Sequence, residues 1–286
     1  MYKILPFLFF LSLSAFGQQN PNAPYLPGIS IKSIDNPDLE EVSGLAFSKK
    51  HPDKWYTHTD SGGESAVYVL DSLGREIGKI ILDEVDNRDW EDIAVGPGPN
   101  GKSYVYVAEI GDNAGAHKSV KIFRFPEPDQ LTKKLTVKPE VLEFTYPGGA
   151  MDAESLFVDP ISKDLFVVSK RDAQNTLFRL KAGDFGKQNV VAEAVGKLPF
   201  TSATAADISQ DGSRILVKNY FKIYYWERKS GETVAVAMAR KPKELPYVPE
   251  PQGEAIGFQP NGKAFYTISE KRFDIFPVLY RYPAKN

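Results

Sequence analysis

The chain has 286 residues, with 35 Lys and Arg against 37 Asp and Glu, and a formal net charge of −2. This balance excludes the basic excess that is typical of nucleic-acid-binding proteins. The sequence contains no cysteine, which excludes disulfides, thiolate catalysis and zinc sites built from thiolates.

The first 17 residues are predicted to be a secretory signal peptide. Lys3 supplies a positive start, an apolar stretch runs from Ile4 to Phe16, and Ala15 and Gly17 are small residues where a signal peptidase reads. A membrane anchor is the alternative, but the stretch is too short for a bilayer of about 30 Å. We expect residues 18–286 to be a single exported domain, periplasmic or extracellular, that is monomeric and has no transmembrane segment.

A short phrase recurs five times in this domain, at steps of 48, 63, 52 and 48 residues. Its copies are EVSGLAF (41–47), DWEDIAV (89–95), DAESLFV (152–158), TAADIS (204–209) and QGEAIGF (252–258). Each copy is followed by a turn signal and by further strand-like runs. A repeat of this length, built from short strands, is typical of a β-propeller.

The number of strand-like runs predicts how the ring closes. Four copies have a fourth strand-like run, at 75–82, 141–146, 189–195 and 232–238. The fifth copy lacks one, and the run ISIKSI (29–34) precedes the first copy without a partner. We therefore predict an all-β fold, a single propeller of five four-stranded blades, in which the N-terminal strand completes the last blade. Six blades are the alternative, but the charged segment 128–140 is interpreted as a loop.

The aligned copies also predict a site. They place Ser43, Glu91, Glu154, Ala206 and Glu254 at one level of the ring. The first strand of a propeller blade lines the central channel, so we expect the three glutamates at the channel mouth. The ends of second strands bring four more polar residues to the same face: Asp112, Lys170, Lys218 and Asn219.

Carboxylates held this close together share protons, pair with lysines or bind a cation. Oxygen ligands without cysteine favour Ca²⁺ or Mg²⁺, and Lys170 and Lys218 are then placed to hold an anionic group. The structural alternative carries about equal weight: the glutamates bond to backbone N–H groups of neighbouring blades and hold the ring together. The IGDN segment (110–113) is interpreted as a turn or as an extra pair of ligands.

The motifs EVSGLAF…HTDSGG, DWEDIA…EIGDN, DAESL…VSK and QGEAI…SE resemble those of a group of exported bacterial propellers. The group includes SdiA-regulated periplasmic proteins and esterase-like or phytase-like propellers, and more distantly the calcium-dependent gluconolactonases. The resemblance to phytase-like propellers implies calcium held by Glu91, Glu154 and Glu254, and phosphate held by Lys170 and Lys218. The resemblance to gluconolactonases implies a metal held by Glu254 with Asn219 and Asp112.

Two hypotheses of function follow. The first is a divalent-metal-dependent hydrolase of a small anionic phosphoester, or of an ester or lactone. In it Glu91 and Glu154 are ligands or the general base, and Lys170 and Lys218 stabilise developing negative charge. The second is a non-enzymatic propeller that binds a ligand or partner on the same face. The sequence lacks nucleophile-elbow, Walker and HExxH motifs and has three histidines, which argues against a Ser-His-Asp hydrolase.

Overall fold

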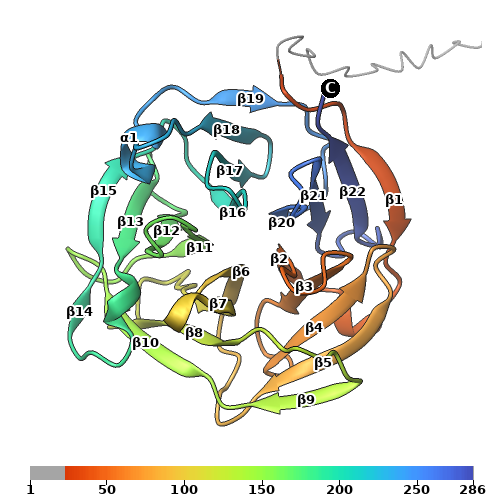
Figure 1. Cartoon of the computed structure of the whole chain (residues 1–286), viewed down its shortest axis with the longest axis horizontal. Coiled ribbons are helices and arrows are strands. Elements are labelled where there is room, and N and C mark those ends of the chain that lie inside the picture. Colours follow the sequence, from red (N-terminus) through yellow and green to blue (C-terminus); the bar gives the residue numbers. More distant parts are fainter. Residues whose placement is uncertain (1–22, 286) are drawn as a thin grey trace, which may run out of the picture.

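The computed structural model describes residues 23–285, and the predicted signal peptide lies outside them. The described residues form five sheets arranged around a central axis (Figure 1). The five-bladed propeller predicted from the repeat is confirmed, and the six-bladed alternative is wrong.

The blades follow one another along the chain, each written here from its innermost strand outward. Blade one contains β2 (Val42–Phe47), β3 (Lys54–Thr59), β4 (Ala66–Asp71) and β5 (Glu76–Leu82). Blade two contains β6 (Trp90–Pro97), β7 (Ser103–Glu109), β8 (Val120–Pro126) and β10 (Glu140–Thr145). Blade three contains β11 (Ala153–Val158), β12 (Leu165–Ser169), β13 (Thr176–Leu180) and β15 (Glu193–Lys197). Blade four contains β16 (Ala203–Ile208), β17 (Arg214–Asn219), β18 (Ile223–Glu227) and β19 (Lys243–Leu245). Blade five contains β20 (Gly253–Phe258), β21 (Ala264–Ser269), β22 (Val278–Pro283) and β1 (Ile29–Ser33). Within residues 23–285, three short 3₁₀ helices lie in connections: η1 (Pro37–Leu39), η2 (Pro99–Gly101) and η3 (Ala182–Asp184).

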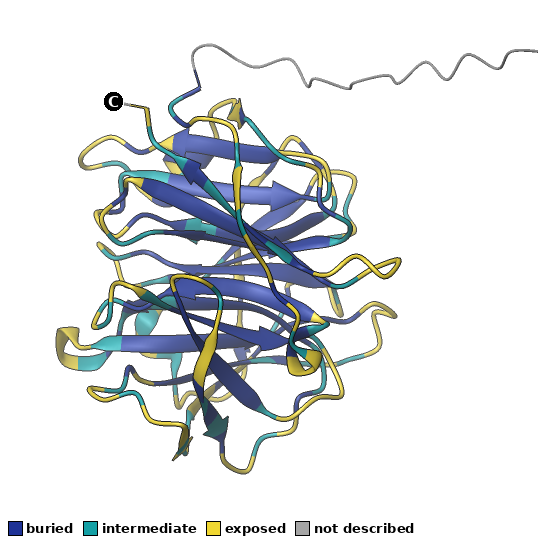
Figure 2. Cartoon of the chain, turned by 90° about the vertical axis from the view of Figure 1, so that its right-hand side faces the viewer, coloured by how far each residue is buried: buried dark blue, intermediate teal, exposed yellow. Residues whose placement is uncertain are grey.

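Burial decreases from the axis to the rim. Every residue of β2, β11 and β20 is buried, because these strands have neighbouring blades on both faces. The outer strand β10 instead begins exposed and then alternates, with Leu142 and Phe144 buried and Glu143 exposed between them. Figure 2 shows the same contrast between buried strands and exposed loops.

The ring closes as predicted. β1 pairs antiparallel with β22, so the N-terminal strand completes the blade that contains the C-terminal strands. Before β1, the buried Tyr25 packs against Phe265, with ring centroids 4.9 Å apart, and its hydroxyl accepts a hydrogen bond from Arg214 of blade four at 3.0 Å. The segment therefore fastens blade five to blade four as well.

Two outer edges carry an extra strand that the repeat does not predict. β9 (Lys134–Val137) leaves the long connection of blade two and pairs in parallel with β5 of blade one. This corrects the interpretation of 128–140 as a loop throughout. β14 (Val190–Val191) pairs in parallel with β10 of blade two, so the predicted run 189–195 is divided between two blades.

The predicted strand at 232–238 is wrong, because this segment is the helix α1 (Val234–Met238). Its N-cap is Thr233, whose side chain accepts a hydrogen bond from the Val236 N–H. Val234, Ala237 and Met238 are its buried residues, at the i, i+3 and i+4 spacing of one helix face. The fourth strand of blade four is β19 instead.

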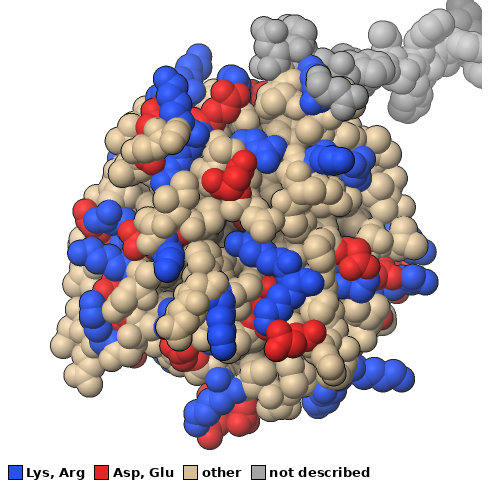
Figure 3. Space-filling model, in the orientation of Figure 1, with Lys and Arg blue, Asp and Glu red and all other residues tan. Residues whose placement is uncertain are grey.

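Charges of both signs are interspersed on the face shown in Figure 3, without a continuous basic patch. None of the helices in residues 23–285 is long and apolar enough to cross a membrane.

Candidate metal centre

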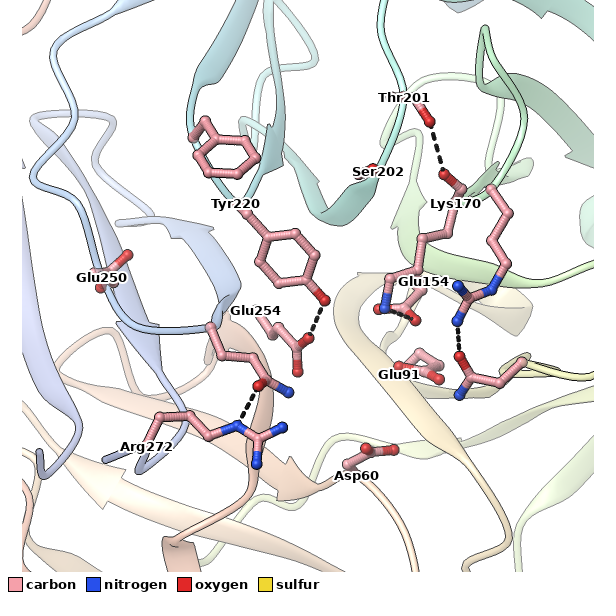
Figure 4. A pocket seen from close by; sticks show the side chains of 14 residues that line it. Asp60, Glu91, Glu154, Lys170, Thr201, Ser202, Tyr220, Glu250, Glu254 and Arg272 are labelled. Atoms are coloured by element: carbon pink, nitrogen blue, oxygen red, sulfur yellow. Dashed lines mark hydrogen bonds and ion pairs between the residues drawn. The ribbon is translucent and has the colours of Figure 1, made fainter. Parts of the chain in front are cut away.

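The glutamates of three blades lie on β-bulges at the start of the innermost strands. In β6, β11 and β20 the pairing with the second strand skips one residue, and the skipped residues are Glu91, Glu154 and Glu254. A bulge leaves its extra residue outside the ladder and re-aims the side chain. The three carboxylates line one pocket, with a volume of about 740 Å³, as predicted for the channel mouth (Figure 4).

In blade four the alignment of the sequence copies is wrong by two residues. The skipped residue of β16 is Thr204, between Ala203 and Ala205, and not Ala206. The alignment failed here because residues 203–206 are alanines and a threonine, so Ile208 is the first large apolar residue on which this copy could be aligned. The Thr204 hydroxyl donates to the Gly253 carbonyl of blade five at 3.1 Å, so this position links two blades.

Carboxylates from blades one to three form two triads that share Glu91. The first is Asp60, Asp89 and Glu91, and the second is Glu91, Asp152 and Glu154. Within each triad, one oxygen from every residue lies within 4.8 Å of the others. The backbone of Gly111 closes over this cluster, since a Cβ there would lie 2.1 Å from Glu91 Oε1.

The cluster strongly disfavours its own ionisation. Burial and the neighbouring Glu154 raise the pKa of Glu91 well above its usual range. Burial and the nearby Asp89 raise the pKa of Asp60 to about 7, and burial also raises the pKa of Asp89. At neutral pH the cluster must therefore keep protons or receive a cation.

Two basic side chains partly compensate this charge. Lys170 pairs with Glu154, and Arg171 Nε lies 2.6 Å from Asp152 Oδ2. Burial opposes the charge of Lys170, but the Glu154 carboxylate raises the pKa of the ammonium above its usual range. Burial raises the pKa of Glu154 to about 8 against the opposing effect of Lys170. Lys170, which lines the pocket, therefore favours the ionised form of Glu154 through this ion pair.

Glu254 lies apart from both triads. Its Oε1 accepts a hydrogen bond from the Tyr220 hydroxyl at 2.8 Å (Figure 4). Burial and a hydrogen bond with Glu254 raise the pKa of Glu270 to about 10, as expected where two carboxyl groups share a proton. Glu254 is therefore bonded to Tyr220 and Glu270 and not to the carboxylates of the two triads.

Lys218, predicted at the pocket, lies within the protein beneath it. Its side chain is fully buried and does not line the pocket. Its Nζ donates to the Gly253 carbonyl at 2.5 Å and to the Tyr247 hydroxyl at 3.2 Å, and lies 3.9 Å from Glu250 Oε2. It anchors the segment that precedes Glu254.

Asp112 and Asn219, the other predicted ligands, bind backbone groups with their side chains. The Asp112 carboxylate accepts from the N–H groups of Ala116 and His117 at 2.8 and 2.9 Å. The Asn219 side chain accepts from Phe221 N–H at 3.0 Å and donates to the Thr201 carbonyl. Neither lines the pocket, so the geometry favours the turn interpretation for Asp112, while its neighbour Asn113 lines the pocket and accepts a hydrogen bond from Arg171.

The bonds between blades that the structural alternative required are made by aspartates. The fully buried Asp92 accepts from the N–H groups of Leu156 at 2.8 Å and Ala206 at 3.2 Å, which belong to blades three and four. Asp207 accepts from Phe258 N–H of blade five at 2.7 Å. These two residues join the ring around the axis.

Sequence reasoning missed Tyr220 and Arg272, which line the pocket. Each lies just beyond the end of a second strand: Tyr220 directly follows β17, and Arg272 lies three residues after β21. The sequence signal that could have identified them is their position in the loop that follows a second strand, because the ends of these strands lie on the face with the pocket.

No protein-family model matches the chain, and neither does any curated protein. A solved structure of a nidogen–laminin complex contains a similar chain, with 12% sequence identity and a TM-score of 0.48 over 80% of this chain and 72% of that one. Function is therefore argued from the site alone.

Proposed function

We propose that the central pocket binds a divalent cation, with Ca²⁺ as the first candidate, and hydrolyses a small anionic phosphoester, ester or lactone. The observation that carries the proposal is the pair of carboxylate triads that share Glu91 beside an open pocket. The protein would act after export, where Ca²⁺ sites with dissociation constants of about 10⁻⁴–10⁻³ M are common.

The donor set fits such a cation. It consists of carboxylate oxygens, which are the ligands that Ca²⁺ and Mg²⁺ prefer. Asp60 Oδ1 is buried and has no hydrogen-bond partner among the described residues. A buried oxygen of this kind requires a cation, a proton or water.

A bound divalent cation would polarise the scissile group and lower the pKa of a water molecule. The chain's own residues would orient the reactants. Glu91 and Glu154 would hold the cation or accept a proton, and Lys170 would fix the position of Glu154 through their ion pair. At the opposite wall the Tyr220 hydroxyl, which donates its proton to Glu254, would hold that carboxylate in position.

Thermal unfolding of residues 18–286 in EDTA, and then with Ca²⁺, Mg²⁺ or Mn²⁺, tests cation binding. At a concentration about 100 times the dissociation constant, a cation that binds only the folded state adds about 2.7 kcal/mol. For a domain of this size we expect the midpoint to rise by roughly 5–10 °C. Phosphoester and lactone substrates are then assayed with the effective ion, with Glu154→Gln as the inactive control. No rise with any ion would refute the metal centre.

A non-enzymatic ligand-binding propeller is the second candidate. The exposed Phe221 at the pocket favours it, since solvent-exposed aromatic side chains are typical of recognition surfaces. Cation binding without turnover of any ester, lactone or phosphoester would support this candidate.

A further inference from the structure

We propose that the ligand of the central pocket is a small organic anion that carries a flat apolar group, such as an aromatic ring. The proposal rests on the proposed function only in taking this pocket as the binding site. Its anion is held by Arg272 and its ring by Phe221.

One wall of the pocket is aromatic. Phe221 lines the pocket and is 79% exposed, in a site whose other walls are mostly charged. Its ring meets the edge of Tyr220, with centroids 6.5 Å apart and planes at 72°. Tyr220 is itself held by its bond to Glu254 and by the Lys170 ammonium 5.5 Å from its ring centroid. The wall is therefore a supported apolar surface that faces the pocket.

The aromatic wall belongs to blade four, whose innermost strand β16 contributes no side chain to the pocket. Blade four has Thr204 at the bulge, and that side chain is bonded to blade five. A ligand that enters the pocket thus meets carboxylates from blades one, two, three and five and an apolar surface from blade four. This asymmetry favours a ligand with a polar end and an apolar end.

Arg272 is the basic side chain of the pocket that is most available to a ligand. Lys170 is paired with Glu154, and Lys218 is buried beneath the pocket. Arg171 also lines the pocket, but it is paired with Asp152 and donates to the Asn113 side chain. The side chain of Arg272 lines the pocket and is 55% exposed.

Arg272 retains unused donors. Its Nε bonds the Gln252 side chain and lies 3.9 Å from Glu270 Oε2, while neither terminal nitrogen has a hydrogen bond to any residue in 23–285. Figure 4 shows its guanidinium group extending into the space between Glu254 and Asp60. A guanidinium fork matches the two oxygens of a carboxylate or phosphate. These donors would bind the anion, and they would offset its repulsion by the carboxylate cluster.

Calorimetric titration with four probes tests the proposal: phenyl phosphate, methyl phosphate, benzoate and acetate, each with and without the divalent ion. Contact with Phe221 should make phenyl phosphate bind about tenfold more tightly than methyl phosphate. Comparing the two phosphates with the two carboxylates shows which anion Arg272 prefers. In Phe221→Ala the preference for the aromatic member should fall to about twofold or less.

Matched variants separate the site from the surface around it. Phe273→Ala changes an aromatic residue that is 89% exposed on the neighbouring β21–β22 loop and does not line the pocket, so the preference should persist. Arg272→Gln should weaken both phosphates about tenfold. Arg75→Gln, whose side chain is 71% exposed and pairs with Asp71, should not.

Equal affinity for phenyl and methyl phosphate, or no binding of any probe, overturns the proposal. So does an equal loss of preference in Phe221→Ala and Phe273→Ala. If the cation binds but the aromatic preference is absent, this inference fails alone. If the aromatic preference is present in EDTA and no cation binds, the metal centre fails and this inference stands.

Discussion

At the scale of single residues, Glu91 differs from the other glutamates because it belongs to both carboxylate triads. Glu254, predicted from the same repeat position, is bonded to Tyr220 and Glu270 instead. One repeat position has therefore acquired two different roles. The difference arises from the loops that meet each glutamate, which the repeat does not encode.

Glu91→Gln should change stability in opposite directions with and without the cation. In EDTA the midpoint should rise by a few degrees, because the change removes a buried carboxyl whose ionisation is opposed by burial and by Glu154. With the effective cation the wild-type stabilisation should be lost. The measurement is thermal unfolding of both proteins under both conditions.

Glu254→Gln is the matched control, since it changes the same repeat position outside the triads. It should retain most of the stabilisation by the cation. If Glu91→Gln retains the full wild-type stabilisation, the assignment of the shared ligand is wrong.

At the scale of elements, the sequence predicts the inner strands well and the rim poorly. The inner strands are apolar throughout and bounded by turn signals, so the pattern itself specifies them. The helix α1 was mistaken for a strand because Val234 and Val236 alternate with alanines. Its helical form depends on the Thr233 cap and on packing against the rim of the ring. β9 has only two half-buried apolar residues, Leu135 and Val137, and needs β5 as a partner.

The candidate site shows the same limit. The glutamates and Lys170 could be placed at the pocket because a repeated bulge position and the ends of second strands fix them. Lys218 was wrongly expected there, since whether a side chain at a strand end faces the pocket or the space between blades depends on the neighbouring blade. The aromatic wall at Phe221 lies on a loop, for which the repeat carries no pattern.

Closure of the ring by the N-terminal segment can be tested at Tyr25. Its side chain is buried among aromatic residues of blades four and five. Tyr25→Ala should cost about 3–5 kcal/mol, the range for large aromatic residues in cores. Chemical denaturation monitored by tryptophan fluorescence measures this free energy of unfolding.

Leu26→Ala is the neighbouring control, because Leu26 is 42% exposed. It should change the free energy of unfolding by about 0.5 kcal/mol or less. Equal effects of the two substitutions would mean that the segment does not fasten the ring.

At the scale of the whole molecule, the propeller buries many carboxyl groups for two different purposes. Asp92 and Asp207 bond to backbone N–H groups and join blades around the axis. The triads around Glu91 lie at one mouth of the same channel and have few donors of this kind. The closed ring fixes these mutually repelling carboxyl groups close together. Ionising them therefore lowers the free energy of unfolding of the whole domain.

The loss of stability on ionisation of these carboxyl groups predicts how stability depends on pH in the absence of a cation. Burial and Asp89 raise the pKa of Asp60 to about 7, and burial raises that of Asp207 to about 7. The unfolded chain releases these protons near pH 4, so the folded protein binds more protons between these values. Stability is therefore present at low pH and is lost as the pH rises through about 7.

The midpoint of thermal unfolding in EDTA should fall by several degrees between about pH 6.5 and about pH 8.5. The range starts at about 6.5 because burial lowers the pKa of His58 to about 4, which favours the opposite trend at lower pH. Asp207→Asn should reduce the slope without changing stabilisation by the cation, since Asp207 lies outside both triads. The cation itself should stabilise more strongly as the pH rises, because it competes with protons for the triad carboxylates. A midpoint that stays level or rises with pH in EDTA would contradict the raised pKa values of Asp60 and Asp207 in the folded protein.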